Sequence, residues 1–517
     1  MASQLSKSLL RDLPDAIKFV ILNFLHKQEK AVVFFVNKEF SEKVLDFKAW
    51  RVFQFCSKYR ISDRISERFL HNVISAYIIR INQSFETQSV QQNVFEYLAQ
   101  NTVATDICLS DKIFSTDEAT ASQISRLLEN KHQLSSLELH KMVIGHQSCT
   151  ALIETLPKVP IKCLSLVGAH TLYPFLKSLG SITSLTHLSF HGSSLHGELK
   201  LLVDSLNSIS SIQFLDLSNN QLDHTDMEQW AMCTNTSITS LNFDKNIIWD
   251  HGISILADWI HPNLNTLMLS YNNMSTMGAN ILAGVHKKFS KLILNASCNP
   301  ICNMGAFALA DAFRTTSQQE LFLGKTHMDD LGLVSVISVL TGSSLQLLSM
   351  DHNELCDDGI PFLAHFLKNT NTLKTLDLYL NKISSKGTIL LCEGIALNSS
   401  LTRLNLGNNM IGNIGARSLA EALERHPSIR AVYLESNSIG DEGAIALGNI
   451  LHCANIQTLQ LSHNPICEQG HIALAEGLRH SKCSNLCIWN NGFGKAPYLY
   501  LDLYRHRDNI YIDICEC

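Results

Sequence analysis

The chain has 517 residues, of which 45% are hydrophobic and only 17% are charged, and its formal net charge is −6. A chain of this length is too long for one compact core, so we expect several domains or a stacked array of repeats. The small net charge argues against a general binder of nucleic acid or of membrane surfaces. The sequence has neither an apolar run of about 18 residues for a membrane span nor the apolar core of a signal peptide, which predicts a cytoplasmic protein.

The first fifty residues differ from everything that follows and predict about three short helices. Pro14 stands where a first helical turn would begin. Ile17, Ile21 and Leu25 then recur at the spacing of one helix face. A second apolar run and a third short segment, which ends at Trp50, follow. We therefore expect a small helical domain over this stretch.

This segment resembles an F-box. The resemblance lies in Leu13-Pro14, in the aliphatic residues after it, and in Val36-Asn37-Lys38-Glu39-Phe40, where the family usually has V-C-K-x-W. It implies docking to a Skp-type adaptor of a cullin-type (SCF) ubiquitin ligase. The residues that it assigns to adaptor binding are Leu13, Pro14, Ile17, Ile21, Leu25, Val36 and Trp50. The alternative is that these helices only shield the first repeat from water.

Residues 51–102 contain no recognisable chemistry and predict a helical bridge that also caps the array. Phe69, Val73 and Tyr77 have the spacing of core-facing helical residues. A flexible linker would be richer in Gly, Pro or Ser. We therefore expect a rigid connection between the first domain and the segment that follows.

From residue 103 to residue 491 the chain repeats one sequence unit, about 15 times. The clearest copy begins with Leu401, Leu404 and Leu406 and reaches Asn409, giving L-x-x-L-x-L-x-x-N. The leucines predict a short strand, and the asparagine predicts a turn whose backbone groups it hydrogen bonds. Ten asparagines fall in register at this position, namely Asn220, Asn246, Asn272, Asn299, Asn353, Asn381, Asn409, Asn437, Asn464 and Asn491. The period of these units is typical of leucine-rich repeats.

The second half of each unit predicts a helix that begins with small residues, such as Gly278-Ala279 and Gly415-Ala416. Small residues let a helix pack closely on the strand behind it. The units resemble leucine-rich repeats of the ribonuclease-inhibitor type. We therefore expect an α/β solenoid shaped as a horseshoe, with parallel strands on the concave side and helices on the convex side, preceded by the all-α domain. Residues 492–517 depart from the pattern and predict a C-terminal cap.

Motifs for catalysis or for metal binding are missing from the sequence. There is no phosphate loop of the form G-x-x-x-x-G-K-[ST] and no H-E-x-x-H. Histidines such as His140 and His352 follow predicted strands, where a polar surface residue is expected. The C-x-x-x-C pairs at Cys298 and at Cys483 have no second matching pair. We therefore expect no enzyme, no metal site and no cofactor, and we expect the 15 cysteines to be reduced.

The outward-facing strand positions are the candidates for partner binding, because alternate residues of a strand point away from the core. Aromatic residues interleaved with acids on a rigid surface are typical of protein interfaces. The candidates are Phe322, Asp351, Asp377, Tyr379, Arg403, Tyr433, Glu435 and Trp489. The alternative is that the aromatic rings only stack on neighbouring strands.

Together these patterns predict a protein–protein interaction adaptor: the substrate receptor of an SCF ubiquitin ligase, with the concave face holding a target protein. A non-catalytic binding protein or inhibitor, whose N-terminal helices are only a cap, is the second hypothesis. An F-box followed by leucine-rich repeats is a eukaryotic arrangement, and effectors that bacteria secrete into the host-cell cytoplasm resemble it. The degenerate F-box and the charge-poor repeats, rich in Asn and Ser, favour the bacterial origin. Activation of a GTPase is a third and weaker hypothesis.

Overall fold

The computed structural model describes residues 98–110, 117–129, 131–140, 145–169, 172–289, 291–316, 318–479 and 481–492. It also describes residue 96 and the strands at 52–55, 78–81 and 511–513. The F-box-like segment, with the seven residues assigned to adaptor binding, lies outside the described residues, as do most of the predicted bridge and most of the C-terminal cap.

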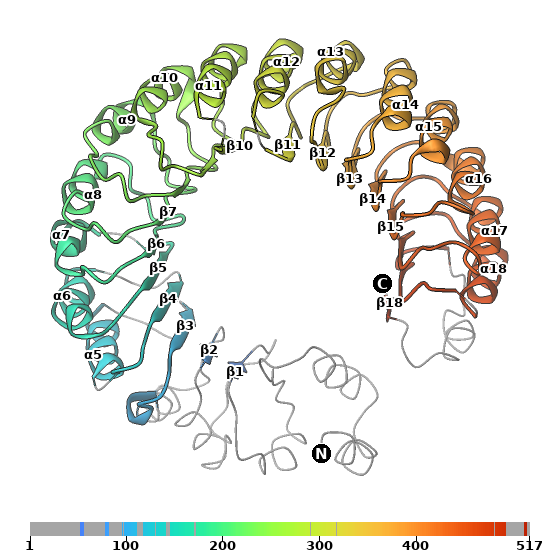
Figure 1. Cartoon of the computed structure of the whole chain (residues 1–517). Helices are drawn as coiled ribbons and strands as arrows, with labels where there is room; N and C mark the ends of the chain where they lie inside the picture. Colours follow the sequence, from blue (N-terminus) through green and yellow to red (C-terminus); the bar gives the residue numbers. More distant parts are fainter. Residues whose placement is uncertain are drawn as a thin grey trace, which may run out of the picture. The chain divides into compact units, whose positions relative to one another are not determined.

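The described residues belong to two compact units. The first contains the chain up to Leu222 together with Met232–Asn242, and the second contains Asp223–Ala231 and the chain from Phe243 onward. In each unit, parallel strands alternate with helices along the chain, with the strands on one side and the helices on the other (Figure 1). The predicted α/β leucine-rich-repeat solenoid is confirmed for this part of the chain.

The first unit pairs each strand in parallel with the next one along the chain. Its strands are β1 (Val52–Phe55), β2 (Ile78–Ile81), β3 (Asp106–Ser110), β4 (Ser136–His140), β5 (Cys163–Val167), β6 (His187–Ser189), β7 (Phe214–Asp216) and β8 (Ser240–Asn242). Its helices are α5 (Asp117–Leu128), α6 (His146–Thr155), η2 (Leu156–Lys158), α7 (Tyr173–Ser178), η3 (Leu179–Ser181) and α8 (Leu199–Leu206).

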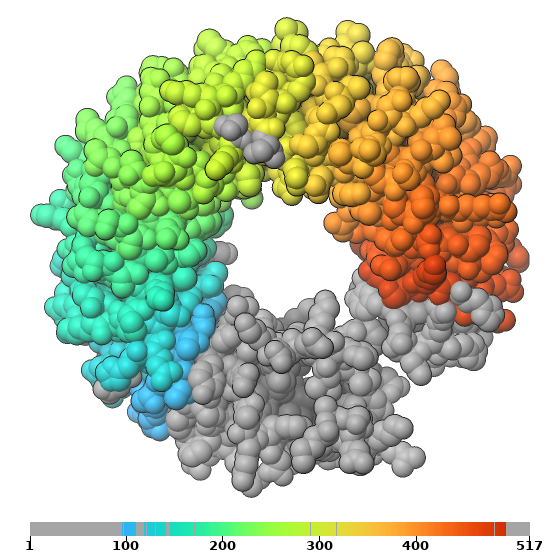
Figure 2. Space-filling view, in the orientation of Figure 1, coloured from blue at the N-terminus to red at the C-terminus, as the bar shows by residue number. Residues whose placement is uncertain are grey.

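The second unit repeats the same arrangement more regularly, and its helices pack each against the next. Its strands are β9 (Thr266–Met268), β10 (Ile293–Asn295), β11 (Glu320–Phe322), β12 (Leu347–Ser349), β13 (Thr375–Asp377), β14 (Arg403–Asn405), β15 (Ala431–Tyr433), β16 (Thr458–Gln460), β17 (Asn485–Cys487) and β18 (Tyr511–Asp513). Its helices are α9 (His224–Trp230), α10 (Trp249–Trp259), α11 (Thr276–Lys288), α12 (Cys302–Phe313), α13 (Asp330–Leu340), α14 (Ile360–Asn369), α15 (Ser385–Leu397), α16 (Gly412–Leu423), α17 (Asp441–Ile450) and α18 (Glu468–Leu478). On the face shown in Figure 2, the atoms of neighbouring repeats are in contact along this unit.

The core of each repeat consists of the leucine-type positions that the sequence pattern singled out. Leu404 at the centre of β14 is fully buried, as are Leu401 and Leu406 on either side of it. Arg403 and Asn405 alternate with them and face outward. This two-residue alternation is what a strand with one buried face requires.

The asparagines form a ladder between repeats. The Asn464 amide nitrogen donates to the carbonyls of Leu434 and Leu461, each at 2.9 Å. Its carbonyl oxygen accepts the N–H groups of Asn437 and Ile439 at 2.9 and 3.0 Å. One side chain thus satisfies four backbone groups that a buried turn would otherwise leave unpaired, which explains why the residue recurs.

Glycines near the helix starts leave room for a side chain from the preceding repeat, a contact that the sequence pattern did not suggest. In α10, the Asp250 carboxylate accepts the N–H groups of Ser275 and Gly278, at 2.8 and 3.0 Å, and so caps the next helix. A Cβ at Gly278 would lie 2.5 Å from that carboxylate oxygen. Asp441 makes the same contact with the start of α18. The glycine is required by the cap from the preceding repeat, and not only by close packing on a strand.

The prediction of a helical bridge over residues 51–102 is wrong where the structure has strands. Strands β1 and β2 fall inside residues 51–102, and β2 pairs in parallel with β3. The repeat sheet therefore begins earlier than the predicted boundary at residue 103. The leucine spacing that marks later strands is absent here, and Ile79 and Ile81 occupy the places of leucines.

The twelve cysteines in the described ranges form no disulfide with one another. None of the helices in this part of the chain combines the length and the apolar character needed to cross a bilayer.

Candidate functional site

Outward-facing residues of β12–β17 in the second unit form the candidate site, which we call the ledge. It consists of Asp351, Asp377, Tyr379, Arg403, Tyr433, Glu435 and Trp489, with His352, Asn408 and His463 beside them. The strand register aligns the first part of it, because Asp377 pairs with Asn405 and Asn405 pairs with Tyr433. The ledge therefore brings together side chains that belong to separate, successive repeats of the sequence.

Two acids lie at its beginning, on neighbouring strands. Asp351 accepts a hydrogen bond from the Ser349 hydroxyl, and its second oxygen lies 3.0 Å from the His352 ring nitrogen. Asp377 accepts the N–H of Tyr379 at 2.9 Å. Burial raises the pKa of Asp377, and the Asp351 carboxylate raises it further, whereas the Tyr379 N–H lowers it.

Tyr379 is held on two sides. Its hydroxyl accepts a hydrogen bond from the Asn408 amide at 2.7 Å, and its ring centroid lies 5.3 Å from that of His352. The residue is half-buried. This ring therefore contacts both neighbouring repeats, as the stacking alternative expects, and is still partly open to solvent.

Arg403 and Tyr433 form a second pair across adjacent strands. The Arg403 Nε donates to the Tyr433 hydroxyl at 3.2 Å, and a terminal guanidinium nitrogen donates to the same oxygen. The guanidinium carbon lies 5.0 Å from the ring centroid, within the range of a cation–π contact. This pairing fixes the orientation of both side chains at the surface.

Glu435 is a half-buried acid of the ledge. No donor in the described part of the chain lies within hydrogen-bond distance of its buried oxygen Oε2. Burial raises the pKa of Glu435, and the Asp377 carboxylate raises it further, whereas the backbone N–H of Glu435 and His463 lower it. A carboxylate held in this way is stabilised by any cation brought next to it.

Trp489 and Phe322 mark the two ends. Trp489 packs against His463, with ring centroids 4.0 Å apart in an edge-to-face arrangement. Phe322 ends β11 and pairs in register with Ser349, so it lies one strand before the first acid. The structure thus places six of the eight predicted residues on four successive repeats, with these two aromatic residues beyond them.

Residues with positive φ recur along the repeats, which the sequence analysis did not predict. The residue directly before the recurring asparagine adopts a left-handed conformation, as in His352 (φ 53°), Leu380 (φ 51°), Asn408 (φ 55°) and His463 (φ 57°). Asparagine tolerates this conformation, whereas leucine rarely adopts it. Leu380 is nevertheless 38% exposed there. The conformation recurs outside the ledge, for example at Lys245 and Tyr271, so it belongs to the turn of the repeat.

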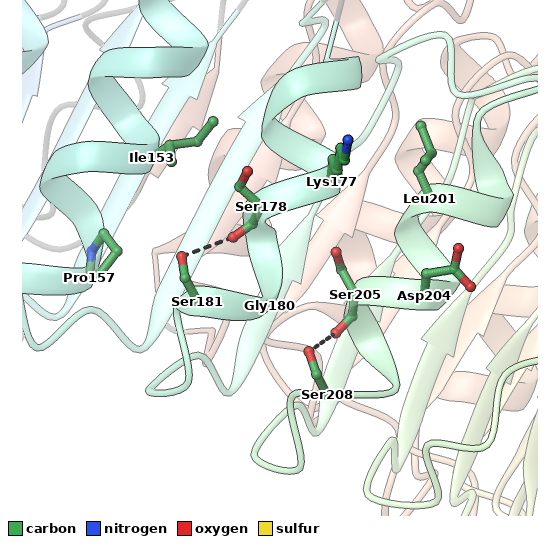
Figure 3. Close-up of a pocket in the computed structure, with 10 residues that line it drawn as sticks. All are labelled: Ile153, Pro157, Lys177, Ser178, Gly180, Ser181, Leu201, Asp204, Ser205 and Ser208. Atoms are coloured by element: carbon green, nitrogen blue, oxygen red, sulfur yellow. Dashed lines mark hydrogen bonds between the residues drawn. The ribbon is translucent and has the colours of Figure 1, made fainter.

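A groove on the helix side of the first unit is a different candidate. It lies between the ends of α6, α7 and α8, has a volume of about 740 Å³, and includes Lys177, Asp204 and several serines (Figure 3). Of the three helices beside it, α7 has only six residues, whereas α6 has ten and α8 has eight. The hydroxyls of Ser181 and Ser208 donate to carbonyls of their own turns, so they are already engaged. These hydroxyls are therefore not available as donors to a ligand, and we favour the ledge as the candidate site.

Comparison with known proteins identifies the repeats. A family model described as "Leucine Rich repeat" matches residues 370–392, 397–420 and 425–448, which span much of the ledge. The first fifty residues lie outside these matches. The chain is 30% identical to human NACHT, LRR and PYD domains-containing protein 5 over 150 residues, which are 28% of this chain and 12% of that protein. It is 26% identical to human NACHT, LRR and PYD domains-containing protein 13 over 263 residues, 48% of this chain and 25% of that protein.

The chain thus spans a quarter or less of the length of these human relatives. Among solved structures, it is similar to an internalin from Listeria monocytogenes strain 4b F2365. The TM-score is 0.41 and the identity 18%, over 66% of this chain and 83% of that one.

Proposed function

We propose that this chain is a non-catalytic scaffold that binds a protein partner through the ledge. The observation that carries the proposal is Glu435, a half-buried carboxylate whose buried oxygen lacks a donor within the described residues. Beside it stand the orientated rings of Tyr379 and Tyr433. Aromatic anchors next to incompletely paired charges are typical of residues that contribute most to protein–protein affinity.

The charge of the ledge favours a basic partner segment. The ledge contains three acids, Asp351, Asp377 and Glu435, and one arginine, Arg403. The pKa values of Asp377 and Glu435 are both raised. An arginine or lysine of the partner would relieve this like-charge repulsion and would lower both pKa values. Leu380 and Trp489 would supply apolar contact at its sides.

The test uses the full chain against a displayed peptide library, followed by calorimetry of selected peptides against the wild type. We expect selected peptides to be basic, and we expect Leu380→Asn and Glu435→Gln each to weaken their binding about tenfold or more. Asparagine suits the left-handed backbone at position 380, so this change should not lower the thermal stability. Phe362→Ala, at an exposed site on α14, is the matched control.

Selection of acidic peptides, or equal binding by Leu380→Asn, Glu435→Gln and the wild type, would refute the ledge as the binding surface. A fall in melting temperature for Leu380→Asn would instead assign that side chain to packing.

The finer form of the proposal is that the chain is a substrate receptor. The F-box-like residues Leu13, Pro14, Ile17, Ile21, Leu25, Val36 and Trp50 would engage a Skp-type adaptor of a cullin-type ubiquitin ligase, while the ledge holds the target. What supports it is the resemblance of the first fifty residues together with their place before the repeats. Other subunits would then transfer ubiquitin to the bound target.

Co-purification of the full chain with a purified Skp-type adaptor tests this form. We expect a stable complex, lost in the double variant Leu13→Ala/Pro14→Ala, which leaves the repeats unchanged. If the native chain does not bind the adaptor, the substrate-receptor form fails. The second hypothesis then remains, which is a binding protein or inhibitor, including a secreted bacterial effector of that kind. Its support is the ledge alone.

A further inference from the structure

Three side chains on β3 and β4 of the first unit offer metal-ligand atoms at one place on the sheet. In the parallel register, Cys108 pairs with Glu138, and His140 follows two residues later on the same face of β4 (Figure 1 shows the two strands side by side). The Cys108 Sγ, a Glu138 carboxylate oxygen and a His140 ring nitrogen all lie within 4.8 Å of one another.

We propose that Cys108, Glu138 and His140 form a binding site for a zinc ion. Thiolate sulfur, imidazole nitrogen and carboxylate oxygen are the three ligand types that Zn²⁺ takes from proteins. The presence of one thiolate among them disfavours Mg²⁺ and Ca²⁺, which prefer sets made only of oxygen atoms.

The observed spacing is close to what tetrahedral zinc requires. Zn–S and Zn–N bonds of about 2.3 and 2.0 Å place neighbouring ligand atoms roughly 3.4 to 3.6 Å apart. The His140 Nε2 and the Glu138 Oε2 are already 3.2 Å apart. Rotation of the Cys108 side chain about its χ1 bond is enough to bring the sulfur in, because a side-chain rotation of this kind moves Sγ by an ångström or more without moving the strand.

The exposure of the three groups suits a site with an open coordination position. Cys108 is 9% exposed, whereas the side chains of His140 and Glu138 are 37% and 43% exposed. The metal would thus rest on the sheet through the sulfur and present its fourth position to solvent. Three protein ligands with water in the fourth position is the arrangement of zinc sites that accept a further ligand.

The surrounding charges also favour a cation. Asp106 lies two residues before Cys108 on β3, on the same face of the sheet, and so adds a carboxylate beside the three ligands. Asp106 is itself held by the Thr105 hydroxyl at 2.6 Å. A negative potential of this sign lowers the free energy of a bound Zn²⁺ and compensates for deprotonation of the Cys108 thiol.

The sequence could not have suggested this site, because its ligands come from two repeats. Cys108 and Glu138 lie a whole repeat apart in the sequence, with none of the short spacings that mark zinc motifs. Only the register of β3 against β4 places them together. The proposal departs from the expectation of no metal site, which was drawn from missing local motifs.

The test titrates chelator-treated full chain with Co²⁺ and with Zn²⁺. We expect one tight Co²⁺ site with thiolate-to-cobalt charge-transfer absorption, displaced by one equivalent of Zn²⁺, and a rise in melting temperature with Zn²⁺. Cys108→Ser should abolish the charge-transfer band, and His140→Ala and Glu138→Gln should each weaken Zn²⁺ binding at least about tenfold.

Two thiol variants serve as controls, because exposed cysteines occur among the described residues and a thiolate is a metal ligand in general. Cys163→Ser removes the neighbouring thiol on β5, and Cys302→Ser removes an exposed thiol of the second unit. Both should retain the band and the affinity. Absence of a tight site in the wild type, or an equal loss in Cys163→Ser or Cys302→Ser, would overturn the proposal. If Cys108→Ser fails to fold, Glu138→Gln and His140→Ala decide by the same criterion.

Discussion

Tyr379 and Glu435 belong to repeats that are not neighbours, yet both side chains close over Gly407 in the repeat between them. A Cβ at position 407 would lie 2.9 Å from a Tyr379 ring carbon and 2.6 Å from the Glu435 carboxyl carbon. The missing side chain is therefore what lets an aromatic ring and a carboxylate from two flanking repeats share one small area. The irregularity of one repeat creates the most distinctive part of the ledge.

Gly407→Ala should displace both side chains. Because the added methyl group overlaps the ring and the carboxyl, we expect a loss of about 1 to 3 kcal/mol in the free energy of unfolding, together with weaker partner binding. Denaturant unfolding and calorimetry measure the two effects. Gly284→Ala is the control, since a Cβ there meets no atom within 4 Å in the exposed part of α11. That change should stabilise by up to about 1 kcal/mol.

Glu435→Gln should stabilise the protein while weakening its function. The raised pKa means that the folded state favours the protonated carboxyl, so the charged form lowers stability at neutral pH. Removing the charge should raise the free energy of unfolding by less than about 1 kcal/mol, since the group is only half-buried. The difference from the wild type should vanish at acid pH, below the ordinary carboxyl pKa, where both side chains are neutral. A difference between the two proteins that is the same at neutral and at acid pH would contradict the burial of this charge.

Asp441→Ala should loosen the start of α18. Its Oδ1 accepts the N–H groups of Cys467 at 2.7 Å and of Gly470 at 2.9 Å, and alanine leaves both without this acceptor. We expect a loss of about 1 to 2 kcal/mol, measured by thermal or denaturant unfolding. Asp441→Asn should retain most of the stability, because Asn413 makes the same contacts with the start of α17. A similar loss in both variants would show that the charge matters more than the hydrogen bonds.

Mild acid should destabilise the second unit through His471. Burial lowers the pKa of this fully buried histidine to about 4, against the action of the Asp441 carboxylate. Below the ordinary pKa near 6.5 the unfolded chain takes up a proton that the folded chain refuses. The stability that depends on the neutral ring is therefore fully present above about pH 6.5 and falls as the pH drops towards 4, by at most about 1.4 kcal/mol per pH unit.

His471→Leu should flatten this acid dependence in urea unfolding between neutral pH and about pH 4. The exposed His452, changed to alanine, should leave it unchanged. An unchanged slope in His471→Leu would mean that other groups govern the acid response, such as His286 and His426, whose pKa values burial also lowers.

The sequence by itself determined the repeat, its strand, its helix and its asparagine turn. Leu404 and Asn409 could be placed without coordinates, because the strand alternation and the turn depend on neighbours a few residues away. The same regularity located the outward positions Tyr379 and Glu435. It failed for β1 and β2, whose sequences VFQF and IIRI contain no leucine.

Only the tertiary structure decided which outward positions meet. The approach of Tyr379 to Glu435 depends on the absence of a side chain at Gly407, and the grouping of Cys108 with Glu138 depends on the register of two strands. Asp250 reaching the next helix start is a contact of the same kind. Contacts between repeats are fixed by distances of a few ångströms between groups that a whole repeat of chain separates. A one-dimensional pattern contains those residues but not the distances between them.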